Sequence, residues 1–207
     1  MNQELLRPLK DRRLPPLVPE EFARRAMSKV LTNGKDKEVL LTLQAAVATT
    51  VLSSVREMSF AGLGWGDEDA ALLANALPMC AQLVSLDLVR NPFGGGDGAQ
   101  RLAAAVRDTP TLENVSGIPL KELRADRLTT LDLQQKNLGA LEAMVLADLL
   151  RSVSASITSV NVLSNKLDVD SATILLKVKA EKPSLRTLCG LTHNETELNL
   201  YRCGLGA

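Results

Sequence analysis

One spacing of apolar residues recurs along the chain, and it limits the possible folds more than any other feature. In its clearest copy, Leu83 to Phe93, apolar residues occupy positions 1, 4, 6 and 11, and asparagine occupies position 9. Related stretches begin at Val55, Leu128, Ile157 and Glu195, and incomplete ones begin at Leu112 and Leu185. From 55 to 83 to 112, and again from 128 to 157 to 185, the starts lie 28 or 29 residues apart. A fixed period of this length indicates structural units that stack on one another.

The residue types within each copy predict a short strand with one buried face. Leu86 and Leu88 alternate, as the inward side chains of a strand do. The side-chain amide of Asn91 is expected to be buried and to bind backbone groups where the strand stops pairing. Between the strands, helical spacing of apolar residues predicts helices over 67–77, 97–107, 140–153 and 168–182.

A strand plus a helix every 28–29 residues resembles the ribonuclease-inhibitor type of leucine-rich repeat, over roughly residues 55–207. The resemblance implies an α/β solenoid, curved like a horseshoe, with parallel strands on the concave face and helices on the convex face. Two inserts of unequal length, Pro119 to Arg127 and Thr192 to Glu195, interrupt the period. This insertion pattern is similar to repeats in large leucine-rich-repeat families of unicellular eukaryotes.

Residues 1–54 are expected to form an extended arm followed by a helical N-terminal cap, and residues 55–207 to form the repeats. Four prolines before residue 20 exclude a continuous helix there. Pro19 starts one predicted helix, Asn33-Gly34 ends it, and Asp36 caps a second. The first 35 residues carry eight basic and four acidic side chains. We interpret this excess as a solvated tail, with a docking arm for an acidic partner as the alternative.

The last repeat appears without its helix, because the chain stops two residues after Leu205. The repeats are therefore expected to be incomplete at the C-terminus. An uncovered strand edge there would also permit association with another chain.

Composition excludes several classes of function. There are 24 basic and 24 acidic residues, which argues against a general binder of nucleic acid or of anionic membranes. Three widely spaced cysteines do not form a disulfide framework, so we expect a reducing, cytoplasmic location. No apolar run is long enough for a transmembrane helix.

No catalytic, cofactor or metal site emerges from the sequence, so we do not expect an enzyme. The stretch Phe93 to Ala99 has the context of a phosphate-binding loop, but it lacks the Gly-Lys-Ser/Thr and dinucleotide spacings, and a glycine-rich turn explains it. Cys189, His193 and Cys203 could supply part of a zinc site, but no fourth ligand is evident. We interpret them as packed thiols and a loop histidine.

The concave face of the repeats is the predicted binding surface, because curved solenoids characteristically bind there. Its polar and charged residues suit a protein partner. The residues that we expect to contribute are Arg56, Glu57, Asp87, Arg90, Asp132, Gln134, Asn161, Asn199, Tyr201 and Arg202.

The favoured function is a non-enzymatic protein–protein interaction module, or scaffold. Two alternatives stay open. The Ran GTPase-activating protein has repeats of this kind, so the resemblance implies a GTPase activator, with Arg90 as the residue to test. The chain could also be a structural subunit of a larger assembly.

Overall fold

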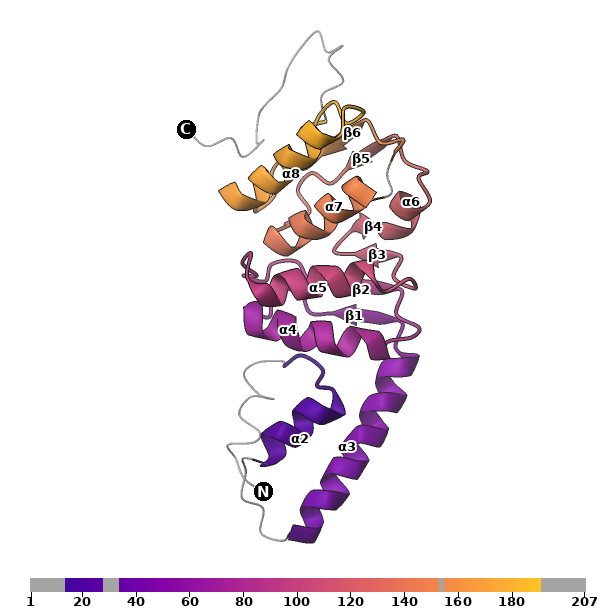
Figure 1. The fold of residues 1–207 in the computed structure, drawn as a ribbon, viewed down its shortest axis with the longest axis vertical. Helices are drawn as coiled ribbons and strands as arrows, with labels where there is room; N and C mark the ends of the chain where they lie inside the picture. The colour runs from indigo at the N-terminus through magenta and orange to yellow at the C-terminus, as the bar shows by residue number, and fades with distance from the viewer. Residues whose placement is uncertain (1–13, 28–33, 153–154, 191–207) are drawn as a thin grey trace.

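The computed structural model describes residues 14–27, 34–152 and 155–190 (Figure 1). Two helices come first, α2 (Pro19–Met27) and α3 (Gly34–Ser54). The first turn of α2 carries Glu20 and Glu21, and its last turn carries Arg24 and Arg25, which suits the helix dipole. Arg24 and Arg25 also pair with the Glu21 carboxylate and lower its pKa to about 2.

The first mixed unit combines short strands with helices on one side. Its elements are β1 (Glu57–Ser59), α4 (Asp67–Ala76), the 3-10 turn η1 (Leu77–Met79), β2 (Ser85–Asp87), α5 (Asp97–Arg107) and β3 (Asn114–Val115). β1, β2 and β3 are parallel. Glu57 pairs with Ser85, so the strand register reproduces the 28-residue spacing of the sequence.

A hairpin then ends this sheet. Ser116 and Gly117 both have positive φ, as two-residue hairpin turns require. The hairpin brings β4 (Ile118–Pro119) antiparallel to β3, and α6 (Leu120–Arg124) follows directly. The four strands thus have the order β1-β2-β3-β4, and β4 takes the edge at which another parallel strand would have to pair.

The second sheet starts afresh after α6. Among the described residues, its strands are β5 (Thr130–Asp132) and β6 (Ser159–Asn161), which are parallel, with Thr130 opposite Ser159. α7 (Ala140–Ser152) connects them, and α8 (Val169–Glu181) follows β6. Residues 185–190 run beside β6, where the Arg186 amide donates to the carbonyl of Thr158.

The prediction of a leucine-rich-repeat horseshoe is therefore wrong. The described residues form a mixed α/β structure with two small separate sheets, one of them containing an antiparallel strand, and not one continuous parallel sheet on a concave face. The physical reason is the insert at Pro119 to Arg127, which the sequence shows as an interruption. Together with the preceding Ile118, it forms β4, the second half of a hairpin, and then α6, and β4 blocks the edge of β3.

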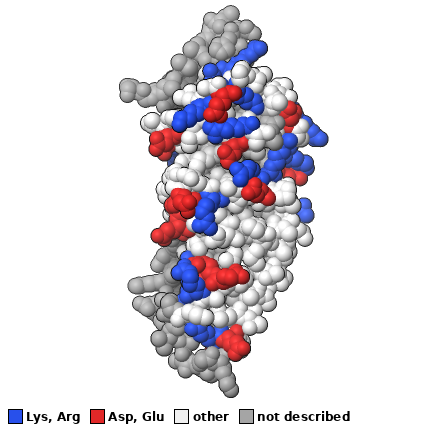
Figure 2. Space-filling view, in the orientation of Figure 1, with Lys and Arg blue, Asp and Glu red and all other residues white. Residues whose placement is uncertain are grey.

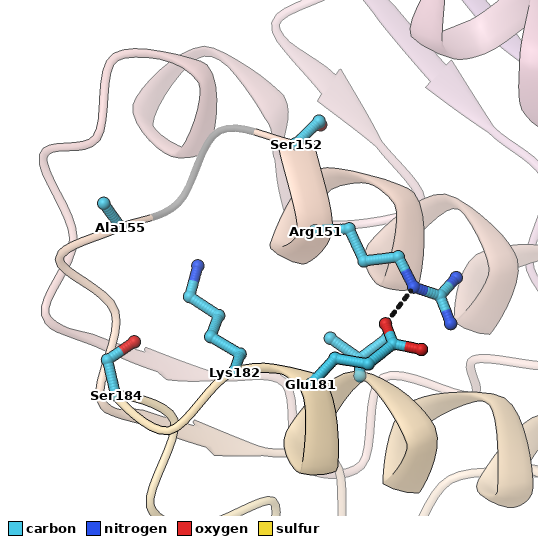
Figure 3. Close-up of a pocket in the computed structure, with 7 residues that line it drawn as sticks. Arg151, Ser152, Ala155, Glu181, Lys182 and Ser184 are labelled. Atoms are coloured by element: carbon cyan, nitrogen blue, oxygen red, sulfur yellow. Dashed lines mark hydrogen bonds and ion pairs between the residues drawn. The ribbon is translucent and has the colours of Figure 1, made fainter.

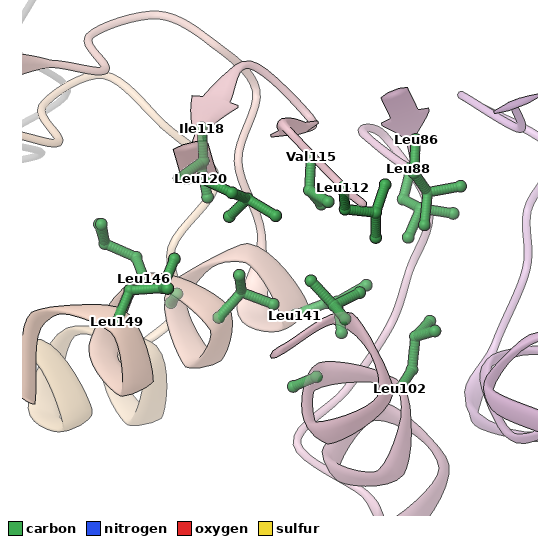
Figure 4. Packing of buried hydrophobic residues seen from close by; sticks show 14 of the residues in the cluster. Leu86, Leu88, Leu102, Leu112, Val115, Ile118, Leu120, Leu141, Leu146 and Leu149 are labelled. Atoms are coloured by element: carbon green, nitrogen blue, oxygen red, sulfur yellow. The ribbon is translucent and has the colours of Figure 1, made fainter. Parts of the chain in front are cut away.

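The helices and core are more continuous than the sheets. α4, α5, α7 and α8 pack in succession, and Figure 1 shows them stacked as one layer beside the strands. Leucine, valine and alanine dominate the buried cluster. Figure 4 shows Leu86 of β2 and the nearby Leu88 packing toward α5, and Ile118 of β4 and Leu120 of α6 packing toward α7. The insert thus completes the core between the two sheets.

Arg124 fixes α6 to the end of α5. Its guanidinium donates to the carbonyls of Val106, Arg107 and Leu112 at 2.8–3.1 Å. Val106 and Arg107 belong to the last turn of α5, where carbonyls lack helical partners. Burial lowers the pKa of Arg124 from its very high ordinary value. A cation from the insert therefore caps the preceding helix.

Candidate protein-binding face

The outward faces of the strands carry the side chains that the sequence predicted for binding. Glu57 and Asp87 lie on neighbouring strands of the first sheet, with Ser59 opposite Asp87. Asp132 lies opposite Asn161 in the second sheet. Glu57 and Asp132 are exposed, and Asp87 and Asn161 are half-buried. The structure therefore places these residues in two separate groups, one on the strand pair β1–β2 and the other on the strand pair β5–β6. Asn199, Tyr201 and Arg202 lie outside the described residues.

A turn at the end of each strand holds the outward side chain in place. The carboxylate of Asp87 accepts from the Val89 amide at 3.2 Å, and that of Asp132 accepts from the Gln134 amide at 3.0 Å. Asn161 does the same with its side-chain oxygen and the Leu163 amide, at 3.2 Å. Asp and Asn favour such turns because their short side chains reach the backbone two residues ahead. These polar groups are consequently positioned before any partner arrives.

The residue three places after each of Asp87, Asp132 and Asn161 has a left-handed backbone. The φ values are 62° at Arg90, 58° at Gln135 and 57° at Ser164. This conformation is uncommon for residues other than glycine. It projects the Arg90 side chain from the end of β2 as an exposed group. Arg90 also borders a cavity of about 280 Å³ together with Lys166 and Asp168.

Two asparagines behind this face perform the role predicted for Asn91. The Asn91 amide donates to the carbonyls of Phe60 and Leu88, at 2.8 and 2.9 Å, and its oxygen accepts from the Trp65 amide at 3.0 Å. Asn165 binds the Leu133 and Val162 carbonyls and the Leu138 amide in the same way. Each asparagine therefore joins its own strand end to the preceding one. Asn91 is half-buried, not fully buried.

The glycine-rich loop is a structural turn. The two backbone amides that open α5, Gly98 and Ala99, donate to the carboxylate of Asp67 at 2.9 Å each. The carboxylate of Asp67, the first residue of α4, therefore takes the position that a bound phosphate would occupy at the start of α5. A Cβ on Gly98 would collide with the backbone carbonyl of Asp67, which explains the need for glycine.

A buried polar relay behind the strands was not predicted from the sequence. The Leu88 amide donates to Ser116 Oγ at 3.1 Å, and this hydroxyl donates to the Glu142 carboxylate at 2.9 Å. The other oxygen of Glu142 accepts from the Gly139 amide at the start of α7. The spacing of Gly139 and Glu142, a glycine followed three residues later by an acid, also occurs at Gly66 and Asp69, and it is the sequence signal for this kind of helix start. The relay links β2, the hairpin turn and α7.

The cavity between the C-terminal ends of α7 and α8 is shown in Figure 3. It has a volume of about 520 Å³. Arg151 and Glu181 form an ion pair across its wall at 2.8 Å, and Lys182 donates to the Leu150 carbonyl at the end of α7. Burial lowers the pKa of Lys182. Arg151, Glu181 and Lys182 connect the two helix ends to each other, so these three side chains are already engaged within the protein and do not form a ligand-binding site.

The thiols have no catalytic surroundings in the described residues. Cys80 is buried, and burial raises the pKa of its thiol to about 11. Cys189 is half-buried, with its sulfur 3.1 Å from Thr187 Oγ1. His193 and Cys203 of the predicted zinc cluster lie outside the described residues. Within the described ranges, no three His, Cys, Asp or Glu side chains come close enough to hold a metal ion. None of the described helices is both long and apolar enough to cross a membrane.

No protein-family model matches the chain, and no curated protein matches it. The relation to leucine-rich-repeat proteins therefore stays a prediction from the sequence.

Proposed function

We propose that this chain is a non-enzymatic protein-binding module that contacts its partner through the outward faces of β1–β2 and β5–β6. The observation that carries the proposal is the recurring strand-end turn at Asp87, Asp132 and Asn161. Polar side chains fixed in this way lose little conformational entropy when they bind. The face mixes carboxylates, amides and the exposed Arg90, which is the composition of a polar protein interface.

The cysteines support a reducing compartment for this function. Cys80 has a buried, unionised thiol, and Cys189 contacts a threonine hydroxyl. Free thiols are typical of cytoplasmic proteins. We therefore propose that the partner is a cytoplasmic protein.

Photo-crosslinking tests the location of the binding face. A photoreactive amino acid replaces Thr130 on the outward face of β5, or Glu68 on α4 in the helix layer; both positions are exposed. We expect adducts of one defined mass from position 130 and none of that mass from position 68. Equal labelling from both positions would contradict the proposal.

Charge-removing variants then test the residues. Asp87→Asn and Asp132→Asn keep an oxygen for the strand-end turn and remove the charge, so the backbone is expected to stay in place. The affinity for the crosslinked partner should fall about tenfold in the double variant, measured by calorimetry with the purified partner. Glu68→Gln, which removes a charge from the helix layer, is the matched control and should leave the affinity unchanged. An unchanged affinity in the double variant would show that the strand face does not bind.

A second candidate function, activation of a GTPase, rests on Arg90. The side chain is exposed and has no ion-pair partner among the described residues, so it could approach a nucleotide phosphate. A GTPase-activation assay with Arg90→Ala, and with Arg101→Ala on α5 as the exposed control, decides this. Stimulation that is lost only in Arg90→Ala would support it; no stimulation by the unmodified chain would exclude it for the GTPase tested.

A further inference from the structure

One face of α3 is apolar and uncovered. Its exposed side chains are 41–59% accessible, and four of them follow one another at four-residue steps, which places them in a row along the helix. The row consists of Val39, Leu43, Val47 and Val51, and Leu40 lies beside it. No charged residue occurs from Val39 to Ser54. Figure 2 shows this helix as a white band at the lower right, with charged side chains only near its lower end.

A second uncovered apolar surface is the groove between β6 and α8. It has a volume of about 610 Å³. Its lining is mostly apolar and includes Val162, Leu167, Leu175, Leu176 and Leu188. Leu176 is 58% exposed at its wall. Together with Val169 at the start of α8 and Met27, these two surfaces contain the exposed large apolar residues of the described chain.

The two surfaces complement each other in shape and charge. The row on α3 is a ridge of about 18 Å, from the helical rise of 1.5 Å per residue, and the β6–α8 surface is concave. Asp36 is exposed in the first turn of α3, on the side of the helix that carries the row, whereas Lys37 lies about a quarter turn away. Exposed bases, Lys179 and Arg186, line the groove. None of the side chains of Asp36, Lys179 and Arg186 has an ion-pair partner among the described residues. The helix and the groove lie toward opposite ends of the molecule (Figure 1).

We propose that the groove between β6 and α8 receives α3 of a second copy of this chain. Asp36 of one copy then approaches Lys179 and Arg186 of the next, while the apolar row covers Leu176. Because two different surfaces meet, every added copy leaves one free helix and one free groove. Such head-to-tail contacts produce open chains whose length depends on concentration. This contact uses neither pair of strand faces, so it can fail or succeed independently of the proposed function.

Two matched variants test the contact. Leu43→Asp places a charge on the α3 ridge, and Leu176→Asp places a charge in the groove; both leucines are 58% exposed, so neither substitution buries the charge in the core. Light scattering coupled to size exclusion measures the molar mass up to about 1 mM protein. We expect the unmodified chain to exceed 22.3 kDa increasingly with concentration, and each variant alone to stay at 22.3 kDa. Met27→Asp, outside both surfaces, should behave like the unmodified chain.

Mixing the two variants distinguishes this arrangement from others. The Leu176→Asp chain keeps an intact helix and the Leu43→Asp chain keeps an intact groove, so a one-to-one mixture should form a heterodimer of twice 22.3 kDa and nothing larger. In addition, Asp36→Arg should weaken association about threefold, as the loss of an exposed ion pair does, and Arg186→Glu in the same chain should restore it.

Three results would overturn the proposal. A Leu176→Asp chain that still dimerises would show that two α3 helices pair with each other. A mixture that stays monomeric would show that helix and groove do not meet. An unmodified chain that stays at 22.3 kDa throughout would show that the groove has another occupant, such as residues 191–207 of the same chain, or none.

Discussion

Replacing Asn91 by alanine should remove more stability than its partial exposure suggests. Three hydrogen bonds to Phe60, Leu88 and Trp65 disappear, and each contributes about 0.5–1.5 kcal/mol net. The three backbone groups left behind lie beside the buried Leu88 and Trp65. We therefore expect the free energy of unfolding to fall by about 3 kcal/mol, from three bonds of about 1 kcal/mol each.

Urea denaturation followed by circular dichroism measures this change. The denaturant slope should stay constant, which shows that the loss belongs to the folded state. Asn75→Ala is the control, because Asn75 is exposed on α4 and its oxygen accepts only from Arg101 at the surface. We expect the control to change stability by less than about 0.5 kcal/mol. If Asn91→Ala costs no more than Asn75→Ala, the three bonds do not stabilise the strand ends.

Three further predictions concern other parts of the fold. Gly98→Ala should destabilise by more than about 1 kcal/mol and lower the melting temperature, because its Cβ meets the Asp67 carbonyl; Gly95→Ala, in open space in the same loop, should not. Arg124→Met should cost about 2 kcal/mol in urea denaturation, since the carbonyls at the end of α5 lose a charged donor; the exposed Arg127→Met should cost little. Asp168→Ala should lower the free energy of unfolding by about 1 kcal/mol at pH 7. Hydrogen bonds from Ser171 lower the folded pKa of Asp168 below 3.8, so this difference should persist above about pH 4 and disappear as the pH falls through the folded pKa. Urea denaturation at a series of acidic pH values measures it.

The sequence predicted most of the local elements, with one error at the start of α3. This helix begins at Gly34, so Gly34 does not end α2, and Asp36 lies inside α3 and does not cap it. The helix expected over 97–107 is found at those residues, and the structure confirms the strand-end role of Asn91. Apolar periodicity and short-range capping suffice for such features, because each depends on residues close in the chain or on a repeated register.

The arrangement of the strands was not predictable in the same way. The period of 28 or 29 residues holds within each sheet, but it does not say whether one sheet continues into the next. The decisive feature is the Ser116-Gly117 turn, which returns the chain antiparallel and occupies the edge of β3. Likewise, the predicted site residues on the described strands lie on outward faces, but in two groups. The relay through Ser116 and Glu142 joins residues 26 positions apart and has no periodic signal.

The interrupted sheet has a consequence for how the molecule opens. No backbone strand ladder links β4 to β5 in the described residues, so side-chain contacts join the two halves. α5 and α6 pack against α7, Arg107 pairs with Asp148, and Ser116 donates to Glu142. Side-chain packing separates more locally than a continuous ladder does, and proteins often unfold in such contiguous units. Amide hydrogen exchange should therefore divide at this seam, with one protection level for β1–β3 and another for β5–β6. If the two ends of the molecule are pulled by separate attachments, the chain should lengthen first between α5 and α7.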